Sequence, residues 1–478
     1  MLGMRVRGVI AAVVSAAVVA VAGCTDGSVR QDAGTGGGFH AGAPGVGDPY
    51  YPALGNGGYD VISYDLRIRY DPRTDQLTGE ATITAQATEN LSRFNLDLSG
   101  LDVESVRVDG VAAAHERVQD ELVVTPATGL AAGSQFTVDV RYAGVPAPVG
   151  GAALGSEGFI HTEDGAIAIG EPRSASTWFP VNDHPSDKAT YSIAITVPDG
   201  LVALSNGAPE GTTAADGWTT WRWVERSPMA SYLATVVIGE YRVTTTTHNG
   251  KPMVTAVAAS LPEGTADRAL ARTGEIADFL AERFGPYPFE AYGGVVHNQR
   301  QVAFALENQA RPVYSPAFFT DDARGTGVVA HEIAHQWFGN SVSVKHWKDI
   351  WLNEGFAQYA QWLWTEHSGG VPVAAQVERI YSSAGQQMWR VPPGDPGPDM
   401  FTRGGWAIYQ RGGMTLHALR TAVGDDTFFR ILRTWAEEKR DGNATTEEFI
   451  AHAERVSGRS LDSLFDAWLF GTTKPPRP

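Results

Sequence analysis

The chain has 478 residues, a length that allows two or three domains. Hydrophobic residues make up 43% and charged residues 19%, a composition typical of a globular protein and wrong for a disordered one. The formal net charge is -17, which argues against nucleic-acid binding, because phosphate recognition needs a basic surface. The acidity by itself predicts no substrate class.

The N-terminus has the pattern of a secretory signal. Arg5 and Arg7 precede an uncharged apolar run over residues 9–22, which is too short for a transmembrane helix of about 20 residues. The run ends in Val-Ala-Gly-Cys at Cys24, which resembles a bacterial lipoprotein signal. We therefore expect residues 1–23 to be removed and Cys24 to carry a lipid that anchors the protein to the extracytoplasmic face of the cell membrane. The alternative is a secreted protein in which Cys24 is incidental.

Cys24 is the single cysteine of the chain, so a disulfide within the chain and a catalytic thiol elsewhere are both excluded. Residues 24–48 are rich in Gly, Ala, Asp and Ser and predict a flexible tether that cannot bury a core.

Residues 49–248 have mainly β character. Polar and apolar residues alternate over 64–70, 81–85, 136–142 and 191–197, the pattern of strands with one buried face. Turn sequences such as Asp109-Gly110 separate these runs. The pattern predicts an N-terminal antiparallel β-sheet domain.

Residues 249–470 predict a mainly helical domain, which makes the chain an α+β multidomain protein. A Pro/Gly-rich loop interrupts the helices at residues 391–398, and residues 471–478 are expected to be a disordered tail. The expected helices cover about 266–284, 326–339, 353–367, 372–390, 405–423 and 426–439, and another pair runs over about 445–470.

One predicted helix carries a candidate metal site in the sequence His331-Glu332-Ile333-Ala334-His335. Positions i and i+4 share a helix face, so both imidazoles can reach one metal ion. Glu332 can then approach a metal-bound water as a general base without being a ligand. Alone, this five-residue pattern occurs by chance often enough that two incidental histidines are the simpler reading.

A catalytic zinc usually takes three protein ligands and keeps one position open. The third candidate is Glu354, 19 residues after His335, at the start of the next predicted helix. Two histidines and one carboxylate match the thermolysin type of site. With Glu354 included, the pattern favours a site for one zinc ion per chain over two incidental histidines.

Two segments around these residues resemble peptidase family M1, the zinc aminopeptidases. They are the stretch from His331 to Asn340 and the stretch from Trp351 to Ala357. Weaker likenesses lie at residues 51–60, 179–191 and 286–289. The resemblance implies a thermolysin-like catalytic domain, hydrolysis of the N-terminal residue of peptides, and peptides with free N-termini as partners.

The resemblance also implies an amine-binding site. The family motif Gly-x-Met-Glu-Asn corresponds here to residues 304–308, in which Glu307 and Asn308 are kept and Phe304 replaces the glycine. A second family glutamate precedes a Phe-Pro pair by eight residues, and Glu171 stands at that offset from Phe179. These residues are expected to bind the substrate amine, and Phe304 could reshape the first specificity pocket.

A family tyrosine in the context Tyr-x-Lys-Gly corresponds to Tyr409, with Arg411 in place of the lysine. The resemblance implies that Tyr409 hydrogen-bonds the tetrahedral intermediate while Glu332 moves the proton of a zinc-bound water. Many relatives also carry a large C-terminal helical domain for which little room follows residue 470, so the site is expected to be more open. An endopeptidase and a non-catalytic binding protein on a peptidase fold are the alternatives.

Overall fold

The computed structural model describes residues 38–151, 155–402 and 405–477. The predicted signal peptide, Cys24 and tether residues 25–37 lie outside the described residues. None of the helices in the described ranges is both long and apolar enough to cross a bilayer.

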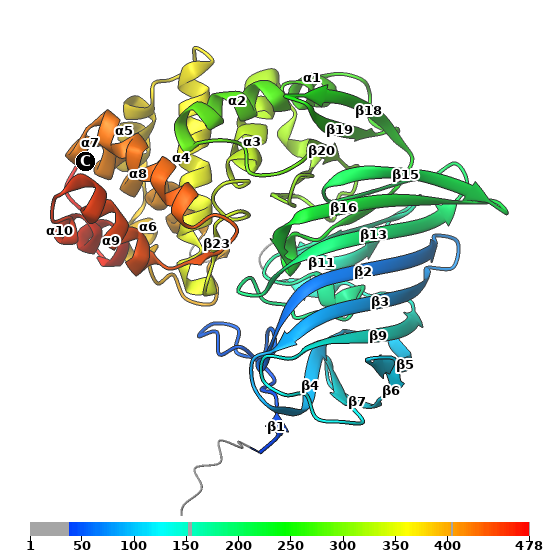
Figure 1. Ribbon diagram of the computed structural model, residues 1–478. Helices are drawn as coiled ribbons and strands as arrows, with labels where there is room; N and C mark the ends of the chain where they lie inside the picture. Colours follow the sequence, from blue (N-terminus) through cyan, green and yellow to red (C-terminus); the bar gives the residue numbers. More distant parts are fainter. Residues whose placement is uncertain (1–37, 152–154, 403–404, 478) are drawn as a thin grey trace, which may run out of the picture. The chain divides into compact units, whose positions relative to one another are not determined.

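The main sheet of the β domain follows from the alternating strands. In β2 (Tyr59–Asp71), buried and less buried side chains alternate, and the buried set includes Leu66, Ile68 and Tyr70. The order of the eight strands is β15 (Ala208–Ala215), β16 (Trp218–Ala230), β13 (Lys188–Pro198), β2, β3 (Gln76–Ala87), β9 (Gln135–Gly144), β5 (Asp102–Val108) and β6 (Val111–Ala112). The sheet is antiparallel as expected, except that β13 and β2 run parallel. Its long strands run side by side in Figure 1.

Two smaller sheets complete this domain. One has the order β1 (His40–Ala41), β4 (Leu91–Asp97), β8 (Glu121–Thr125) and β7 (Ala114–Val118). The other has the order β10 (Val149–Gly151), β11 (Gly155–His161), β12 (Ala166–Ile169), β17 (Val236–Gly239) and β14 (Val202–Ser205). The second sheet leads toward the site, because Glu171 follows β12 directly.

The end of the predicted tether belongs to the fold, which corrects its boundary at residue 48. Strand β1 pairs in parallel with β4, and the Gly42 N–H donates to the Arg93 carbonyl at 2.9 Å. Asp48 is 1% exposed, and its carboxylate accepts the Trp347 N–H at 2.9 Å. The amino-acid composition could not predict that this segment is ordered, because backbone pairing and one buried carboxylate hold it and it buries few apolar side chains.

The second domain begins with its own five-stranded sheet. The order is β18 (Tyr241–His248), β19 (Lys251–Ala258), β20 (Tyr292–Val296), β22 (Val313–Tyr314) and β21 (Ala305–Leu306). The expected boundary at residues 248 and 249 falls at the turn between β18 and β19, which form an antiparallel hairpin. Both strands of this hairpin therefore belong to the sheet of the second domain.

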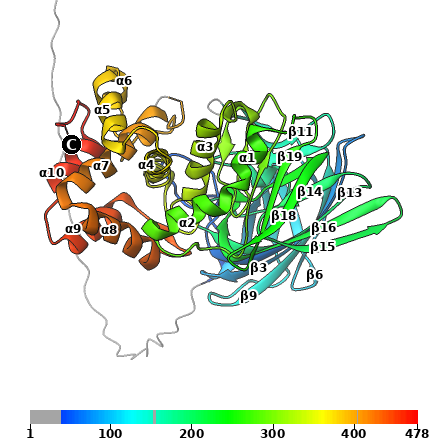
Figure 2. The same cartoon turned by 90° about the horizontal axis from the view of Figure 1, so that it is seen from above.

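Helices form the rest of this domain, and they confirm the expected α+β class. They are α1 (Thr265–Ala271), α2 (Thr273–Phe284), α3 (Asp322–Ala334), α4 (Trp351–His367), α5 (Val373–Ser383), α6 (Gln386–Arg390), α7 (Gly412–Val423), α8 (Asp425–Glu438), α9 (Thr446–Ser457) and α10 (Asp462–Phe465). A π-helical turn, Ala407–Arg411, leads into α7. In Figure 2, α4 is seen almost end-on between α3 and α7, which it contacts on either side.

Three of the expected helices have different ends in the structure. Arg272 separates α1 from α2, and Ala384 and Gly385 separate α5 from α6. Helix α3 ends at Ala334, five residues before the expected end at residue 339. Apolar periodicity continues across such breaks because short neighbouring helices bury the same kind of face.

The expected disordered tail packs against α5, so this expectation was wrong for the described residues up to 477. The Tyr381 hydroxyl donates to the Pro475 carbonyl at 2.7 Å, and Lys474 Nζ donates to the Tyr381 carbonyl at 2.8 Å. Arg477 pairs with Glu378 at 3.1 Å. Hydrogen bonds and one ion pair hold this segment, and its polar composition gives no sign of them.

Candidate zinc and substrate site

Helix α3 positions the two histidines. Its N-cap is Asp321, whose side chain accepts the Arg324 N–H at 2.9 Å. The helix then carries His331 and His335 on one face, with ring centroids 4.9 Å apart. The Nδ1 atom of His335 donates to the Phe338 carbonyl at 3.0 Å. This bond fixes the ring and leaves its Nε2 atom free for a metal ion.

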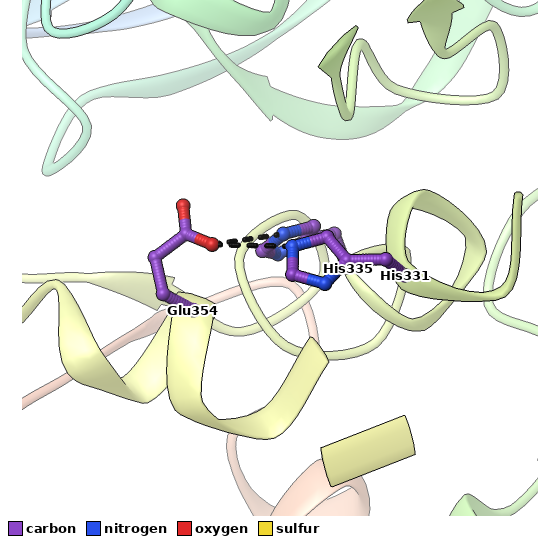
Figure 3. Close-up of side chains that lie close together, drawn as sticks. All are labelled: His331, His335 and Glu354. Carbon is purple, nitrogen blue, oxygen red and sulfur yellow. Dashed lines mark hydrogen bonds and ion pairs between the residues drawn. The ribbon is translucent and has the colours of Figure 1, made fainter. Parts of the chain in front are cut away.

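Glu354 faces both imidazoles from the first turn of α4 (Figure 3). Its Oε2 atom lies 3.3 Å from His331 Nε2 and 3.5 Å from His335 Nε2. Tetrahedral zinc with bonds of about 2.0–2.1 Å requires ligand atoms roughly 3.3–3.4 Å apart. The donor set and spacing therefore fit one zinc ion, and the three residues form a group whose ligand atoms all lie within 4.8 Å of one another.

These three residues line a cavity of about 380 Å³. Four buried carboxylates line it, and they repel one another in a region of low polarity. Burial and the nearby glutamates raise the pKa of Tyr409 well above its usual value, so its phenol keeps its proton. The surplus of negative charge suits a bound metal cation and a cationic substrate group. The four carboxylates are those of Glu171, Glu307, Glu332 and Glu354.

Glu332 lies beside the ligands, as the expected base must. It is 4% exposed and lines the same cavity as the histidines. One carboxylate oxygen of Glu332 belongs to a second close group with Glu307 and His335. Burial raises the pKa of Glu332 well above its usual value.

Glu307 projects into the cavity just after β21, and three neighbours fix it. The Tyr232 hydroxyl donates to Glu307 Oε1 at 3.0 Å. The side chains of Gln336 and Asn340 donate to the Glu307 carbonyl at 3.1 Å and 2.8 Å. Tyr232 comes from the β domain, and no motif in the sequence indicated its role. Gln336 and Asn340 stand inside the segment that carries the family resemblance, but nothing in it assigned them a role.

Asn308 does not line the cavity. It is fully buried, and its Nδ2 atom donates to the Leu233 carbonyl at 3.0 Å. This bond joins the loop after β21 to the β domain, while the Asn308 Oδ1 atom has no hydrogen-bond partner among the described residues. The expected contact of Asn308 with substrate stays a prediction.

Glu171 comes from the β domain, and the fold brings it into the cavity opposite residues of the second domain. It is 2% exposed, and its Oε1 atom has no hydrogen-bond partner among the described residues. Burial and the Glu307 carboxylate raise its pKa well above the usual value. A buried acceptor without a partner is costly, which makes Glu171 a ready site for a donor from a ligand.

Tyr409 lies on the π-helical turn before α7, with its ring stacked on His331 at 5.9 Å between centroids. Its neighbour Arg411 is fully buried and points away from the cavity toward five backbone carbonyls, including those of Trp468 and Trp389. Arg411 therefore holds the turn that presents Tyr409.

Two further side chains lie along the cavity wall. Phe304, half-buried, replaces the small family residue and lines the cavity as expected. Arg324, an exposed cation, also lines the cavity, a position that no motif in the sequence indicated.

Comparisons with known proteins match this architecture. Residues 61–233 match the peptidase M1 N-terminal domain, and residues 268–468 match the peptidase family M1 domain. The structure of the M1 zinc metallopeptidase from Deinococcus radiodurans is 30% identical, with a TM-score of 0.81, and covers 91% of this chain and 98% of that one. The chain belongs to peptidase family M1. A variant of the same Deinococcus enzyme, bound to the substrate Tyr-Ser-Ala, matches with a TM-score of 0.82.

Curated M1 relatives agree. Glutamyl aminopeptidase of Rattus norvegicus is 25% identical over 85% of this chain, and aminopeptidase N of Canis lupus familiaris is 30% identical over 64%. These matches cover 46% and 35% of the two relatives. The chain thus spans about half the length, or less, of the curated relatives it matches. The expected family and its zinc cofactor are confirmed.

Proposed function

We propose that this protein is a zinc aminopeptidase that removes the N-terminal residue of peptides. The observation that carries the proposal is the position of Glu171 and Glu307 in the same cavity as the zinc-site residues. A cationic α-amine bound by these carboxylates places the first peptide bond beside His331, His335 and Glu354. An endopeptidase, whose substrates present no free amine at this position, would gain nothing from the Glu171 and Glu307 carboxylates.

The proposed chemistry divides among the side chains of the cavity. When bound, zinc supplies a Lewis acid that acidifies water and polarises the scissile carbonyl. Glu332 accepts the proton of the attacking water and delivers it to the leaving nitrogen. Tyr409 donates a hydrogen bond to the substrate carbonyl oxygen as negative charge develops there. Tyr232 keeps Glu307 oriented toward the amine.

The test compares a leucine arylamide with its N-acetylated form and a matched internal peptide. We expect the free amine to be cleaved at least a hundredfold faster than the acetylated form, since acetylation removes the cation that Glu171 and Glu307 bind. Equal rates for both forms would favour the endopeptidase instead.

Glu332→Gln separates catalysis from metal binding. It should lower kcat by at least a thousandfold while the zinc content stays near one per chain. A fully active Glu332→Gln variant would rule out this base, and a chain that binds zinc but cleaves no substrate would favour the binding-protein alternative.

We also propose that Cys24 carries a lipid and holds the enzyme at the extracytoplasmic face of a bacterial cell membrane. The support is the basic, apolar and small-residue order of residues 5–24. Cys24→Ala should move the protein from the detergent phase to the aqueous phase in a partition experiment, whereas Thr25→Ala should not. Recovery of wild-type protein in the aqueous phase would favour the secreted alternative.

A further inference from the structure

We propose that a second groove, next to the catalytic cavity, binds the part of a peptide substrate that lies about three to five residues beyond the scissile bond, which makes short oligopeptides the preferred substrates. The inference rests on the proposed aminopeptidase function and extends it to the part of the peptide beyond the scissile bond. The groove, called here the α4–α5 groove, has a volume of about 590 Å³. Its lining includes Gln358, Gln361, Trp362, Ile380, Met388 and Trp406.

The α4–α5 groove adjoins the catalytic cavity, since Gln361 lines both. Helix α4 connects the two, since Glu354, Gln358, Gln361 and Thr365 recur at helical spacing along one face. At 1.5 Å per residue, Gln361 lies roughly 10 Å along the helix from Glu354, and Thr365 roughly 16 Å. Extended peptide rises about 3.3 Å per residue, so these distances correspond to about three to five residues.

Trp406 is the strongest sign of a ligand in this groove. Its side chain is 73% exposed, the largest exposed fraction among the large hydrophobic residues in the described part of the chain. Exposed apolar surface of this size costs free energy in water, and an indole beside a groove supplies a flat face for an apolar side chain.

Glutamine side chains supply the polar contacts that an extended peptide backbone requires. Gln410 donates to Gln358 at 2.8 Å, and Gln358 donates to Gln361 at 3.0 Å. Within the described structure, the Gln410 Oε1 atom has no hydrogen-bond partner. Gln387 is exposed on the far side of the groove. Amides both donate and accept, so they can bind main-chain groups whatever side chains the peptide carries.

The charges of the two cavities match the two ends of a peptide. Four carboxylates and one exposed arginine, Arg324, line the catalytic cavity, whereas the one charged group among the described residues lining the α4–α5 groove is Arg379. A peptide bound with its amine at Glu171 and Glu307 directs its negatively charged end toward Arg379. The groove therefore favours neutral side chains and a free C-terminal carboxylate over basic residues.

The experiment measures kcat/KM for two amidated peptides with the same first residues, Leu-Ala-amide and Leu-Ala-Ala-Ala-Ala-amide. We expect the wild-type enzyme to prefer the longer peptide by about tenfold. Trp406→Ala and Gln387→Ala should reduce this preference at least threefold. Phe39→Ala, which removes another exposed aromatic ring from the β domain, should leave the preference unchanged.

A third arm uses the longer peptide with a free carboxylate. We expect the wild-type enzyme to have a higher kcat/KM for this peptide than for its amidated form. This difference in kcat/KM should be lost in Arg379→Ala. An equal length preference in wild type and Trp406→Ala, or no preference in either, would overturn the groove assignment. These results differ from failure of the proposed function, in which the wild-type enzyme would cleave neither peptide nor the leucine arylamide.

Discussion

The backbones of Gly355 and Gly412 touch, since a Cβ atom on either glycine would lie 2.9 Å from the Cα atom of the other. Gly355 follows the zinc-site residue Glu354 on α4, and Gly412 begins α7 three residues after Tyr409. The absence of both side chains lets α4 approach the turn that carries Tyr409. This contact places the tyrosine beside the zinc ligands.

The first prediction concerns that contact. Gly412→Ala should push α7 away from α4, because the new methyl group meets backbone atoms that cannot move alone. We expect a loss of about 1–3 kcal/mol in the free energy of unfolding and at least a tenfold loss of kcat for the arylamide. Chemical denaturation and steady-state kinetics measure the two effects.

Gly405→Ala is the matched control at the other end of the same segment. A Cβ atom there meets nothing within 4 Å, so this variant should be as stable as wild type or slightly more so. Similar losses in both variants would contradict the role given to the glycine contact.

The second prediction concerns Arg411. Its guanidinium donates to the carbonyls of Trp468, Trp389, Val391, Ala467 and Gly471, at distances between 2.7 and 3.1 Å. Lysine has one point of contact where arginine has a planar fork, so the lysine variant leaves buried carbonyls unpaired. Arg411→Lys should lower the free energy of unfolding by about 2–4 kcal/mol in urea denaturation.

Arg430→Lys is the control, since Arg430 is exposed and donates to a single carbonyl, that of Val456, at 3.2 Å. Its effect should stay within about 0.5 kcal/mol. If Arg411→Lys were equally harmless, the buried arginine would not be what holds the Tyr409 turn.

The third prediction concerns Tyr232, a positioning residue for Glu307. Tyr232→Phe removes the hydroxyl donor, 3.0 Å from Glu307 Oε1, and keeps the ring. A hydrogen bond to a charged group contributes about 1.5–3 kcal/mol, so KM for the arylamide should rise about tenfold or more. The change in kcat should be smaller, because Tyr232 acts on amine binding. Steady-state kinetics over a range of substrate concentrations separates KM from kcat. A fall in kcat with an unchanged KM would contradict this role.

The fourth prediction concerns the metal. Removing zinc with a chelator leaves four buried carboxylates without a compensating cation, so the thermal midpoint should fall by roughly 5 °C or more. Adding zinc back should restore both the midpoint and activity. Glu354→Gln, which removes one ligand, should bind less zinc and respond less to the chelator. If the thermal midpoint of the wild-type protein did not change when the chelator is added, a stabilising ion at His331, His335 and Glu354 would be excluded.

The fifth prediction concerns pH and Asp48. Burial alone would raise the pKa of Asp48, but hydrogen bonds from His184 and from the N–H groups of Trp347, Tyr51 and Tyr50 outweigh it and hold the pKa at about 2. The folded pKa lies below the ordinary 3.8, so the carboxylate stabilises the fold above about pH 4. This contribution of about 2 kcal/mol is lost as the pH falls toward 2.

Asp48→Asn should therefore destabilise the protein at pH 6 and have a smaller effect at pH 3, as measured by urea denaturation at both values. Asp65→Asn, an exposed aspartate on β2, should show little effect at either pH. If Asp48→Asn lowered the free energy of unfolding equally at pH 6 and pH 3, Asp48 would stabilise the fold through its shape and not through its charge.

The sequence alone predicted the candidate zinc ligands and the candidate base, and the structure brings their side chains together. His331 and Glu332 lie in α3 and His335 is its C-cap residue, so the helical period places both histidines on one face. Glu354 is recognisable from its spacing and its place at a helix start. The alternating strands and periodic helices likewise predicted the α+β class, because burial of one face leaves a local trace in the sequence.

Only the tertiary structure decided how the rest of the site is completed. Tyr232 reaches Glu307 across the two domains, and no local pattern records a contact between residues 75 positions apart. Asn308 turned out to bond the backbone of Leu233, and Gly355 meets Gly412 across two helices. Such relations depend on how elements pack, whereas helical and strand periodicity depends on neighbours along the chain.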